Sequence, residues 1–244
     1  MLFTILQGGS LVDILVELIL IMPVILFALS LHETAHGYAA YKCGDMTAYH
    51  MGRLTLNPMR HLDPVGFLCM LVFGFGWAKP VPINTRNFTN PKRGMAISAA
   101  AGPLANLILG VISAALYGFF MALQAYLFYQ TGGTGFAVTA VGWTAVVFEL
   151  SALMNLVFAV FNLLPVPPFD GSRLAFAFLP PKAYFGMMKY ERQIMFGILL
   201  GLLVLSYVFD FSPFGWIANK ITYAVANPVY KGSIDLFSNF LTLK

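Results

Sequence analysis

Long apolar runs, separated by short polar and proline-rich stretches, dominate the chain. The first run extends from about residue 11 to residue 41, two more extend from about 95 to 129 and from about 143 to 164, and a last strong run covers about 193 to 209. A membrane-spanning helix needs about 17 to 25 predominantly apolar residues, and each of these runs reaches that length. The pattern predicts an all-α polytopic membrane protein.

The stretch from 65 to 82 is too short for a full span. Its apolar part, Val65 to Ala78, is rich in glycine and is bounded by Pro64, Pro80 and Pro82. Non-helical backbone at membrane depth is tolerated only where protein or a water-filled cavity satisfies it. We therefore expect a short re-entrant or β-like segment near 65–82, and about five to six membrane segments in all. The alternative is that the glycines and prolines only end a short helix.

Two breaks and a tail complete the pattern. The glycine-rich connection from Thr131 to Gly135 predicts a turn between two long runs. Residues 165 to 171 read Pro-Val-Pro-Pro-Phe-Asp-Gly, which cannot remain a regular helix because proline lacks the backbone N–H and fixes φ. Asp170 lies in this second break. The tail from Phe214 onwards mixes aromatic residues with lysines, so it is expected to lie in the membrane interface or to span weakly.

Composition supports the membrane assignment. Hydrophobic residues make up 59% of the 244-residue chain, charged residues only 10%, and the mean hydropathy is +0.78. Soluble domains carry about 25% charged residues, so lipid must cover much of this surface. The net charge of +4 does not indicate nucleic acid, because the basic residues fall in loops and form no dense stripe. Cys43 and Cys69 are expected to be free thiols, since two cysteines at this spacing make no disulfide framework.

The distribution of basic residues predicts an orientation. Lysines and arginines concentrate in the segments 42–93 and 173–192, whereas the connection 130–142 has none. The positive-inside rule therefore places the basic segments in the cytoplasm, and the 130s loop and the N-terminus outside. Because the first run has no basic segment before it and no small-residue cleavage site after it, we expect it to be retained as a span.

The end of the first run carries the candidate chemistry. It contains His32-Glu33-Thr34-Ala35-His36, in which the two histidines are four residues apart and share one face of a helix. Two such imidazoles can reach a single zinc ion, and Glu33 is placed to deprotonate a water whose pKa the metal lowers towards about 7. The alternative, a coincidental spacing, leaves a charged residue in hydrocarbon without compensation.

A catalytic zinc needs three protein ligands and an open position. His50 and His61 fall among basic and polar residues of a loop, where solvated or structural roles are favoured. Asp170 is the better third ligand, because a carboxylate in an apolar, proline-broken stretch needs a cation. Its alternative role is that of a turn former before Gly171.

With these residues in hand, the chain resembles the site-2 protease family of intramembrane metalloproteases, in the short form without a PDZ-like or nucleotide-sensing CBS domain. The matching segments occur in the order of the family and cover most of residues 28 to 175: HETAH at 32–36, GRLTLNP at 52–58, GFGWAKPVP at 74–82, AGPLAN at 101–106 and NLLPVPPFDGSR at 162–173. An HExxH motif alone is common to many proteases, but its combination with the proline-rich Asp-Gly segment is specific.

The resemblance implies a function and a set of site residues. It implies one zinc ion per chain, with His32, His36 and Asp170 as ligands and Glu33 as general base. It also implies cleavage of transmembrane segments of other membrane proteins near the cytoplasmic face, by a single domain over residues 1–244 in a prokaryotic plasma membrane. Asn106 and Asn162 match polar positions of the family, where each either contacts substrate or the developing oxyanion or bonds neighbouring helices.

Two other classes of function fit the same residues. A metal transporter or channel would use the ligands transiently, but the expected ligands lie near one cytoplasmic edge without a second set along the span. A catalytically silent scaffold that binds transmembrane helices would have no use for the intact Glu33. Both alternatives are disfavoured by these features.

Overall fold

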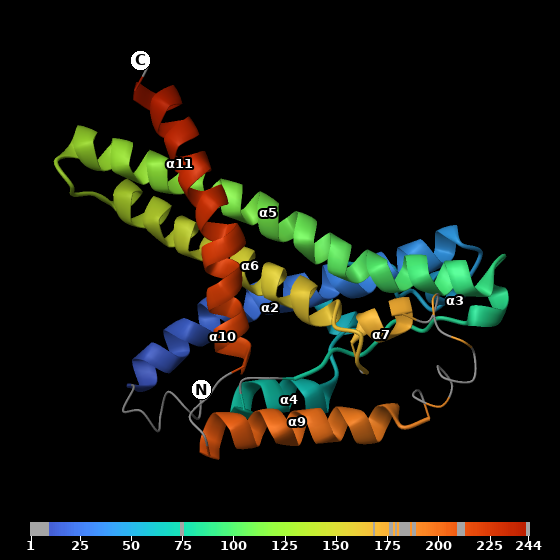
Figure 1. Ribbon diagram of the computed structural model, residues 1–244. Coiled ribbons are helices and arrows are strands. Elements are labelled where there is room, and N and C mark those ends of the chain that lie inside the picture. Colours follow the sequence, from blue (N-terminus) through green and yellow to red (C-terminus); the bar gives the residue numbers. More distant parts are fainter. Residues whose placement is uncertain are drawn as a thin grey trace. The chain divides into compact units, whose positions relative to one another are not determined.

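The computed structural model describes residues 10–73, 76–167, 169–175, 178, 180, 186, 189–208 and 213–242. Figure 1 shows the helices in chain order. They are α2 (Leu11–Lys42), α3 (Thr47–His50), α4 (Pro64–Phe73), α5 (Pro91–Thr131), α6 (Phe136–Asn162), α7 (Asp170–Ala175), α9 (Glu191–Val208), α10 (Pro213–Ile221) and α11 (Asn227–Thr242). Two short 3-10 turns, η1 (Pro58–Arg60) and η2 (Thr85–Asn87), and the π-helical η3 (Thr222–Ala226) complete the elements.

The all-α membrane fold expected from the apolar runs is confirmed. Among the described residues, three helical segments are long and apolar enough to cross a bilayer, namely Leu18–Lys42, Pro91–Thr131 and Phe136–Asn162. The described residues contain no strand, and the last apolar run forms α9 as a helix of 18 residues. The total of five to six membrane segments stays a prediction.

The chain divides into two compact units, each described by itself. Unit 1 comprises residues 1–106 and 159–194, and unit 2 comprises residues 107–158 and 195–244. In unit 1, small buried residues bring α2 close to the first part of α5, because Ala28, Ala40, Ser98 and Ala99 are all at most 4% exposed. The hydroxyl of Ser98 donates to the carbonyl of His36 at 3.0 Å, which ties the two helices together at the end of α2.

The stretch from 65 to 82 is a short helix followed by a returning strand-like segment. Helix α4 has only ten residues. After residues 74 and 75, which lie outside the described part, the chain returns and forms an antiparallel bridge between Leu62 and Ala78. A Cβ on Gly66 would lie 2.2 Å from the carbonyl oxygen of Trp77, so only glycine permits this approach. The β-like character expected here amounts to this one bridge in the described residues.

Unit 2 is built around the hairpin of α5 and α6, which Figure 1 shows as two adjacent helices. The turn between them contains Gly132, Gly133 and Gly135 at φ of 69°, 86° and 132°, a region that favours glycine. Below the turn the rings of Phe120 and Phe148 stack at 5.3 Å. The glycine-rich turn expected from the sequence is therefore present.

Helix α11 packs against α5 within unit 2. Gly118 accommodates Ser233, since a Cβ at position 118 would lie 1.8 Å from the Ser233 hydroxyl oxygen. The rings of Tyr117 and Tyr230 meet at 4.5 Å. The tail expected to lie in the interface or to span weakly is thus helical over the described residues 213–242.

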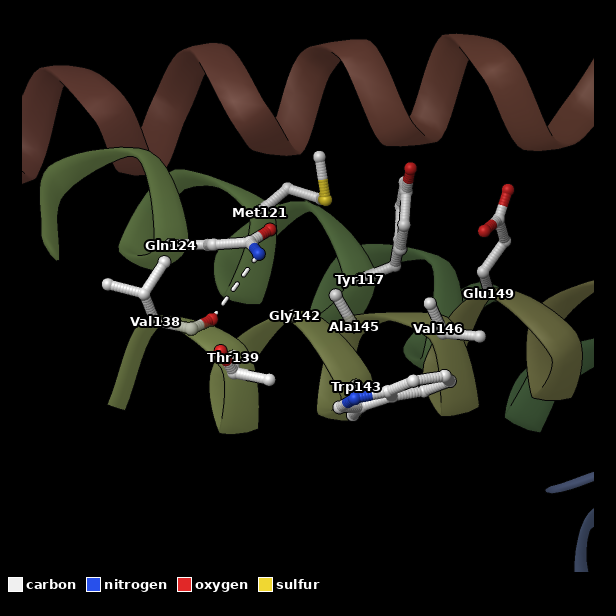
Figure 2. A pocket seen from close by; sticks show the side chains of 10 residues that line it. All are labelled: Tyr117, Met121, Gln124, Val138, Thr139, Gly142, Trp143, Ala145, Val146 and Glu149. Carbon is white, nitrogen blue, oxygen red and sulfur yellow. Dashed lines mark hydrogen bonds between the residues drawn. The ribbon is translucent and has the colours of Figure 1, made fainter. Parts of the chain in front are cut away.

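A cavity of roughly 440 Å³ lies between α5 and α6 in unit 2 (Figure 2). Tyr117 and Glu149 point to the same side of the helix pair, and the side-chain amide of Gln124 donates to the carbonyl of Val138 at 3.3 Å. The lining contains one carboxylate but no imidazole or thiol. It therefore lacks the nitrogen and sulfur donors that zinc sites in proteins commonly use.

Candidate metal centre

Helix α2 presents His32 and His36 on one face. One turn of helix separates them, and their rings meet edge to face with centroids 4.5 Å apart. Their Nε2 atoms lie 2.9 Å from each other. Both residues are only 6% exposed, so the pair is shielded from bulk solvent.

Asp170 reaches this pair from the second chain stretch of unit 1, residues 159–194. It begins the short helix α7, directly after the proline-rich break. Its Oδ2 lies 3.0 Å from Nε2 of His32 and 3.1 Å from Nε2 of His36. Gly171 makes the turn possible, because a Cβ there would lie within 2.4 Å of the carbonyl oxygens of both Leu163 and Leu164.

The far nitrogens of both imidazoles are fixed by acceptors. Nδ1 of His36 donates to the carbonyl oxygen of Ser98 at 2.6 Å. Nδ1 of His32 donates to Oδ1 of Asn106 at 2.5 Å, and Nδ2 of Asn106 donates in turn to the carbonyl of Ala28. A neutral imidazole that donates through Nδ1 has a lone pair on Nε2. Two nitrogen lone pairs and a carboxylate oxygen therefore converge on one point, and a metal cation bound there would interact favourably with all three.

The spacing of the three atoms suits zinc. Ligand atoms about 2.0 to 2.1 Å from a tetrahedral zinc ion lie roughly 3.3 Å apart, and the observed separations are 2.9, 3.0 and 3.1 Å. These three residues are the only group of at least three potential metal ligands among the described residues. Two imidazoles and one carboxylate form a common ligand set of catalytic zinc, and the hydrogen bonds on Nδ1 are those that orient metal-binding histidines.

Gly102 of α5 leaves room for the imidazoles. A Cβ at this position would lie 2.3 Å from Nε2 of His36 and 2.7 Å from Cε1 of His32. Gly102 and Asn106 are four residues apart and thus lie on the same face of α5. This face supplies both the space for one side of the histidine pair and the acceptor for His32.

Glu33 lies beside the pair and is held by a distant backbone amide. The N–H of Val81 donates to Oε2 of Glu33 at 2.8 Å. The hydroxyl of the next residue, Thr34, donates to the carbonyl of Thr55 at 2.7 Å. The loop after α3, which contains Thr55, and the segment after α4, which contains Val81, are therefore anchored on the HETAH segment.

The remaining histidines do not join the cluster. His61 is 2% exposed and bonds through Nε2 to the carbonyl of Thr55 at 2.7 Å, which is a structural role. His50 is exposed and ends α3.

Asn162 is half-buried at the last position of α6, and its role in substrate binding stays a prediction. Cys43 and Cys69 are free thiols, as expected.

The sequence left several contacts of the site unassigned. The AGPLAN segment was visible as a motif, but nothing local assigned Gly102 to the imidazoles or Asn106 to the Nδ1 of His32. Ser98 contributes through its backbone carbonyl, which has no side-chain signature. The contact between Val81 and Glu33 joins residues 48 positions apart, and it could have been found only from the three-dimensional fold.

An all-α membrane fold with a buried pair of histidines, an adjacent glutamate and a carboxylate from a second segment is the arrangement expected of a membrane zinc metallopeptidase. The sequence model of peptidase family M50 matches residues 19–207. Because this match covers most of the chain, the protein belongs to peptidase family M50, and it is a metallopeptidase that uses zinc.

Several bacterial and archaeal proteins are similar to the chain. "Putative zinc metalloprotease YwhC" of Bacillus subtilis is 41% identical over 194 residues, which cover 77% of this chain and 84% of that protein. "Putative zinc metalloprotease Rip2" of Mycobacterium tuberculosis is 31% identical over 152 residues, 60% of this chain and 52% of that protein. "Putative zinc metalloprotease MJ0611" of Methanocaldococcus jannaschii is 28% identical over 151 residues, 59% and 62% of the two chains. No solved structure matches the chain.

Proposed function

We propose that this metallopeptidase is an intramembrane endopeptidase that cuts transmembrane segments of other membrane proteins near the cytoplasmic face. One zinc ion per chain would be held by His32, His36 and Asp170. The observation that carries the proposal is the convergence of their three ligand atoms at the buried end of an apolar helix that is long enough to span a bilayer.

The zinc ion, when bound, supplies Lewis-acid chemistry that polarises a peptide carbonyl and makes a nearby water easier to deprotonate. The chain's own residues do the rest. Glu33 is the general base that takes a proton from the attacking water and then returns it to the amine that leaves. Asn106 and the carbonyl of Ser98 hold the two imidazoles in the orientation that presents Nε2.

The location of the site supports cleavage within the membrane. His32 and His36 lie in the candidate span Leu18–Lys42, close to its basic end. By the positive-inside rule this end faces the cytoplasm, in a multi-pass protein of the plasma membrane. A peptide bond in a helix is shielded by its own hydrogen bonds, so the substrate must unwind locally. Residues 1–244 would form one functional domain for this reaction.

A comparison of membrane-protein fragments tests the proposal. Cells that contain the native chain are compared by proteomics with cells that contain Glu33→Gln at the same level. We expect fragments that end inside apolar segments, on the cytoplasmic side, only with the native chain. Identical fragment sets in the two strains would contradict the proposal. Zinc flux into vesicles without any cleavage product would instead support a transporter.

The orientation has its own test. A cysteine placed at the exposed Thr134, in a chain whose two native cysteines are replaced, lies in the connection that has no Lys or Arg. Membrane-impermeant thiol reagents added to intact cells should label it. Labelling only after the membrane is opened would place this connection in the cytoplasm and reverse the proposed orientation.

A further inference from the structure

The segment 79–81 is clamped between a buried arginine and the candidate base. Nη2 of Arg53 donates to the carbonyl oxygens of Lys79 at 2.8 Å and of Pro80 at 3.2 Å. The next amide, the N–H of Val81, donates to Oε2 of Glu33 at 2.8 Å. A continuous chain of hydrogen bonds therefore leads from the guanidinium of Arg53 to the carboxylate of Glu33.

Arg53 is a charged residue in a buried position. It is only 7% exposed. It pairs with no carboxylate within 4.0 Å in the described part of the chain, and its buried Nε finds no hydrogen-bond partner there. Burial of a charged group is unfavourable unless its donors are satisfied. The carbonyl oxygens of Lys79 and Pro80 accept hydrogen bonds from this guanidinium, so the position of the segment depends on this one side chain.

The sequence of the segment allows only one register. Pro80 and Pro82 have no backbone N–H, so Val81 supplies the only amide between Lys79 and Ile83. A slip of one residue in either direction would place a proline against Glu33 and leave the carboxylate without a donor. Pro82 also restricts Val81 to extended backbone conformations.

Close packing brings this amide to the helix. Gly37 lies one turn after Glu33, and a Cβ there would come within 2.7 Å of Leu54 and 3.0 Å of Val81. The chain is fixed again three residues after Val81, because the N–H of Asn84 donates to Oδ2 of Asp45 at 2.7 Å. The backbone is therefore held on both sides of Val81, and Arg53 holds the side that precedes it.

We infer that Arg53 is a positioning residue for Glu33, acting through the backbone of Lys79, Pro80 and Val81. The inference rests on the proposed role of Glu33 as general base. The hydrogen bond from Val81 fixes Oε2 of Glu33, and Oε1 makes no hydrogen bond to the described residues. One oxygen is thus used for placement, and the other is left for the attacking water.

Five single variants of the purified full chain in detergent, and one double variant, test the inference. Arg53→Gln removes the charge and the planar fork, and Arg53→Lys keeps one strong donor. Val81→Pro removes the amide, whereas Val81→Ala keeps it and shortens the side chain. Arg60→Gln is the matched control, because Arg60 is an exposed arginine of the same loop.

Cleavage of a fluorogenic single-span peptide with a Gly-Pro kink in its apolar stretch gives kcat and KM. We expect Arg53→Gln to lower kcat about 10- to 100-fold, as a misplacement near 1 Å does, with little change in KM and with one zinc ion per chain retained. Val81→Pro should match this loss, Arg53→Lys and Val81→Ala should lose less, and Arg60→Gln should behave as the native chain. In the double variant of Arg53→Gln and Val81→Pro the losses should not multiply, because both break one chain of contacts.

Hydrogen exchange tests the clamp without any substrate. Residues 80–82 contain a single exchangeable amide, that of Val81, and Arg53→Gln should accelerate its exchange at least tenfold. Unchanged exchange, multiplied losses in the double variant, or loss of zinc together with activity in Arg53→Gln would each overturn the inference. If the native chain and Glu33→Gln cleave equally, the proposed function fails, while the exchange result still decides whether the clamp exists.

Discussion

Nδ1 of His32 donates a hydrogen bond to the side-chain oxygen of Asn106, which lies 74 residues further along the chain. The amide nitrogen of Asn106 donates to the carbonyl of Ala28, one turn before His32 on the same helix. Asn106 is fully buried. Both ends of its amide therefore bond to α2, which favours a role in orienting His32 over direct contact with a substrate.

Replacement of Asn106 separates these two roles. Asn106→Ala leaves the Nδ1 proton of His32 without its acceptor, and loss of such a partner typically weakens metal binding by about 10- to 100-fold. We expect weaker zinc binding in competition with a chelator, and full activity when zinc is supplied in excess. Reduced kcat at unchanged zinc affinity would instead assign Asn106 to the substrate or the oxyanion.

Asp170 provides the test of the proposed ligand set. Asp170→Ala removes the carboxylate oxygen that lies 3.0 and 3.1 Å from the two imidazoles. Zinc measured per purified chain should fall well below one, because two imidazoles alone do not complete a catalytic zinc site. Arg173→Ala, in the same short helix, is the control and should keep its zinc. Full zinc occupancy in Asp170→Ala would contradict the assignment and direct the search to the other histidines, His50 and His61.

Gly102 tests the space around the histidines. Gly102→Ala places a methyl group 2.3 Å from Nε2 of His36, and a helix has no freedom to move it aside. We expect loss of zinc and of cleavage, although alanine stabilises a helix by about 1 kcal/mol relative to glycine. Gly110→Ala in the same helix, which meets Leu156 at 2.8 Å instead, should keep zinc. Equal zinc content in both variants would contradict this account.

The local part of the site could be predicted from the sequence, and the remote part could not. His32, Glu33 and His36 lie within two turns of one helix, so their spacing alone places them together. Asp170 is 138 residues from His32, and its selection required both the need of a catalytic zinc for a third ligand and a family resemblance. Gly102 and Val81 act through absent or backbone atoms, which a residue pattern does not reveal.

The fold shows the same division. Apolar runs predicted the long helices α2, α5 and α6, because the membrane fixes the length of such segments. The stretch 65–82 has no single period, and its ten-residue helix and return bridge depend on contacts between Gly66 and Trp77. Packing between segments decided this part of the structure.

Acid should lower the stability of the loops around Asp45, including the one that contains Val81. Asp45 is fully buried and accepts hydrogen bonds from Thr47, Asn84 and Asn87. Burial by itself would raise the pKa of the Asp45 carboxyl, but these hydrogen bonds outweigh it and lower that pKa below its ordinary value. The ionised carboxylate therefore stabilises the fold above the unfolded pKa of about 3.9, and this contribution is lost as the pH falls through the lower folded pKa.

Asp45→Asn tests this dependence by thermal unfolding in detergent between pH 7 and pH 3. At pH 7 the variant should be less stable by about 1 to 3 kcal/mol, because buried donors lose a charged acceptor. The difference should shrink as the pH falls below about 4. Asp235→Asn, an exposed carboxylate of α11, is the control. A difference of equal size at pH 7 and pH 3 would show that ionisation of Asp45 is irrelevant.

Glu33→Gln provides the most direct test of the central claim, that Glu33 is the base beside a zinc held by His32, His36 and Asp170. The substitution keeps the size of the side chain and an oxygen for the N–H of Val81, but it removes the base. Zinc content and cleavage of the kinked single-span peptide are measured on the same purified samples. We predict one zinc ion per chain in both proteins and cleavage by the native chain alone. Cleavage by Glu33→Gln at the native rate, with zinc bound, would contradict the account.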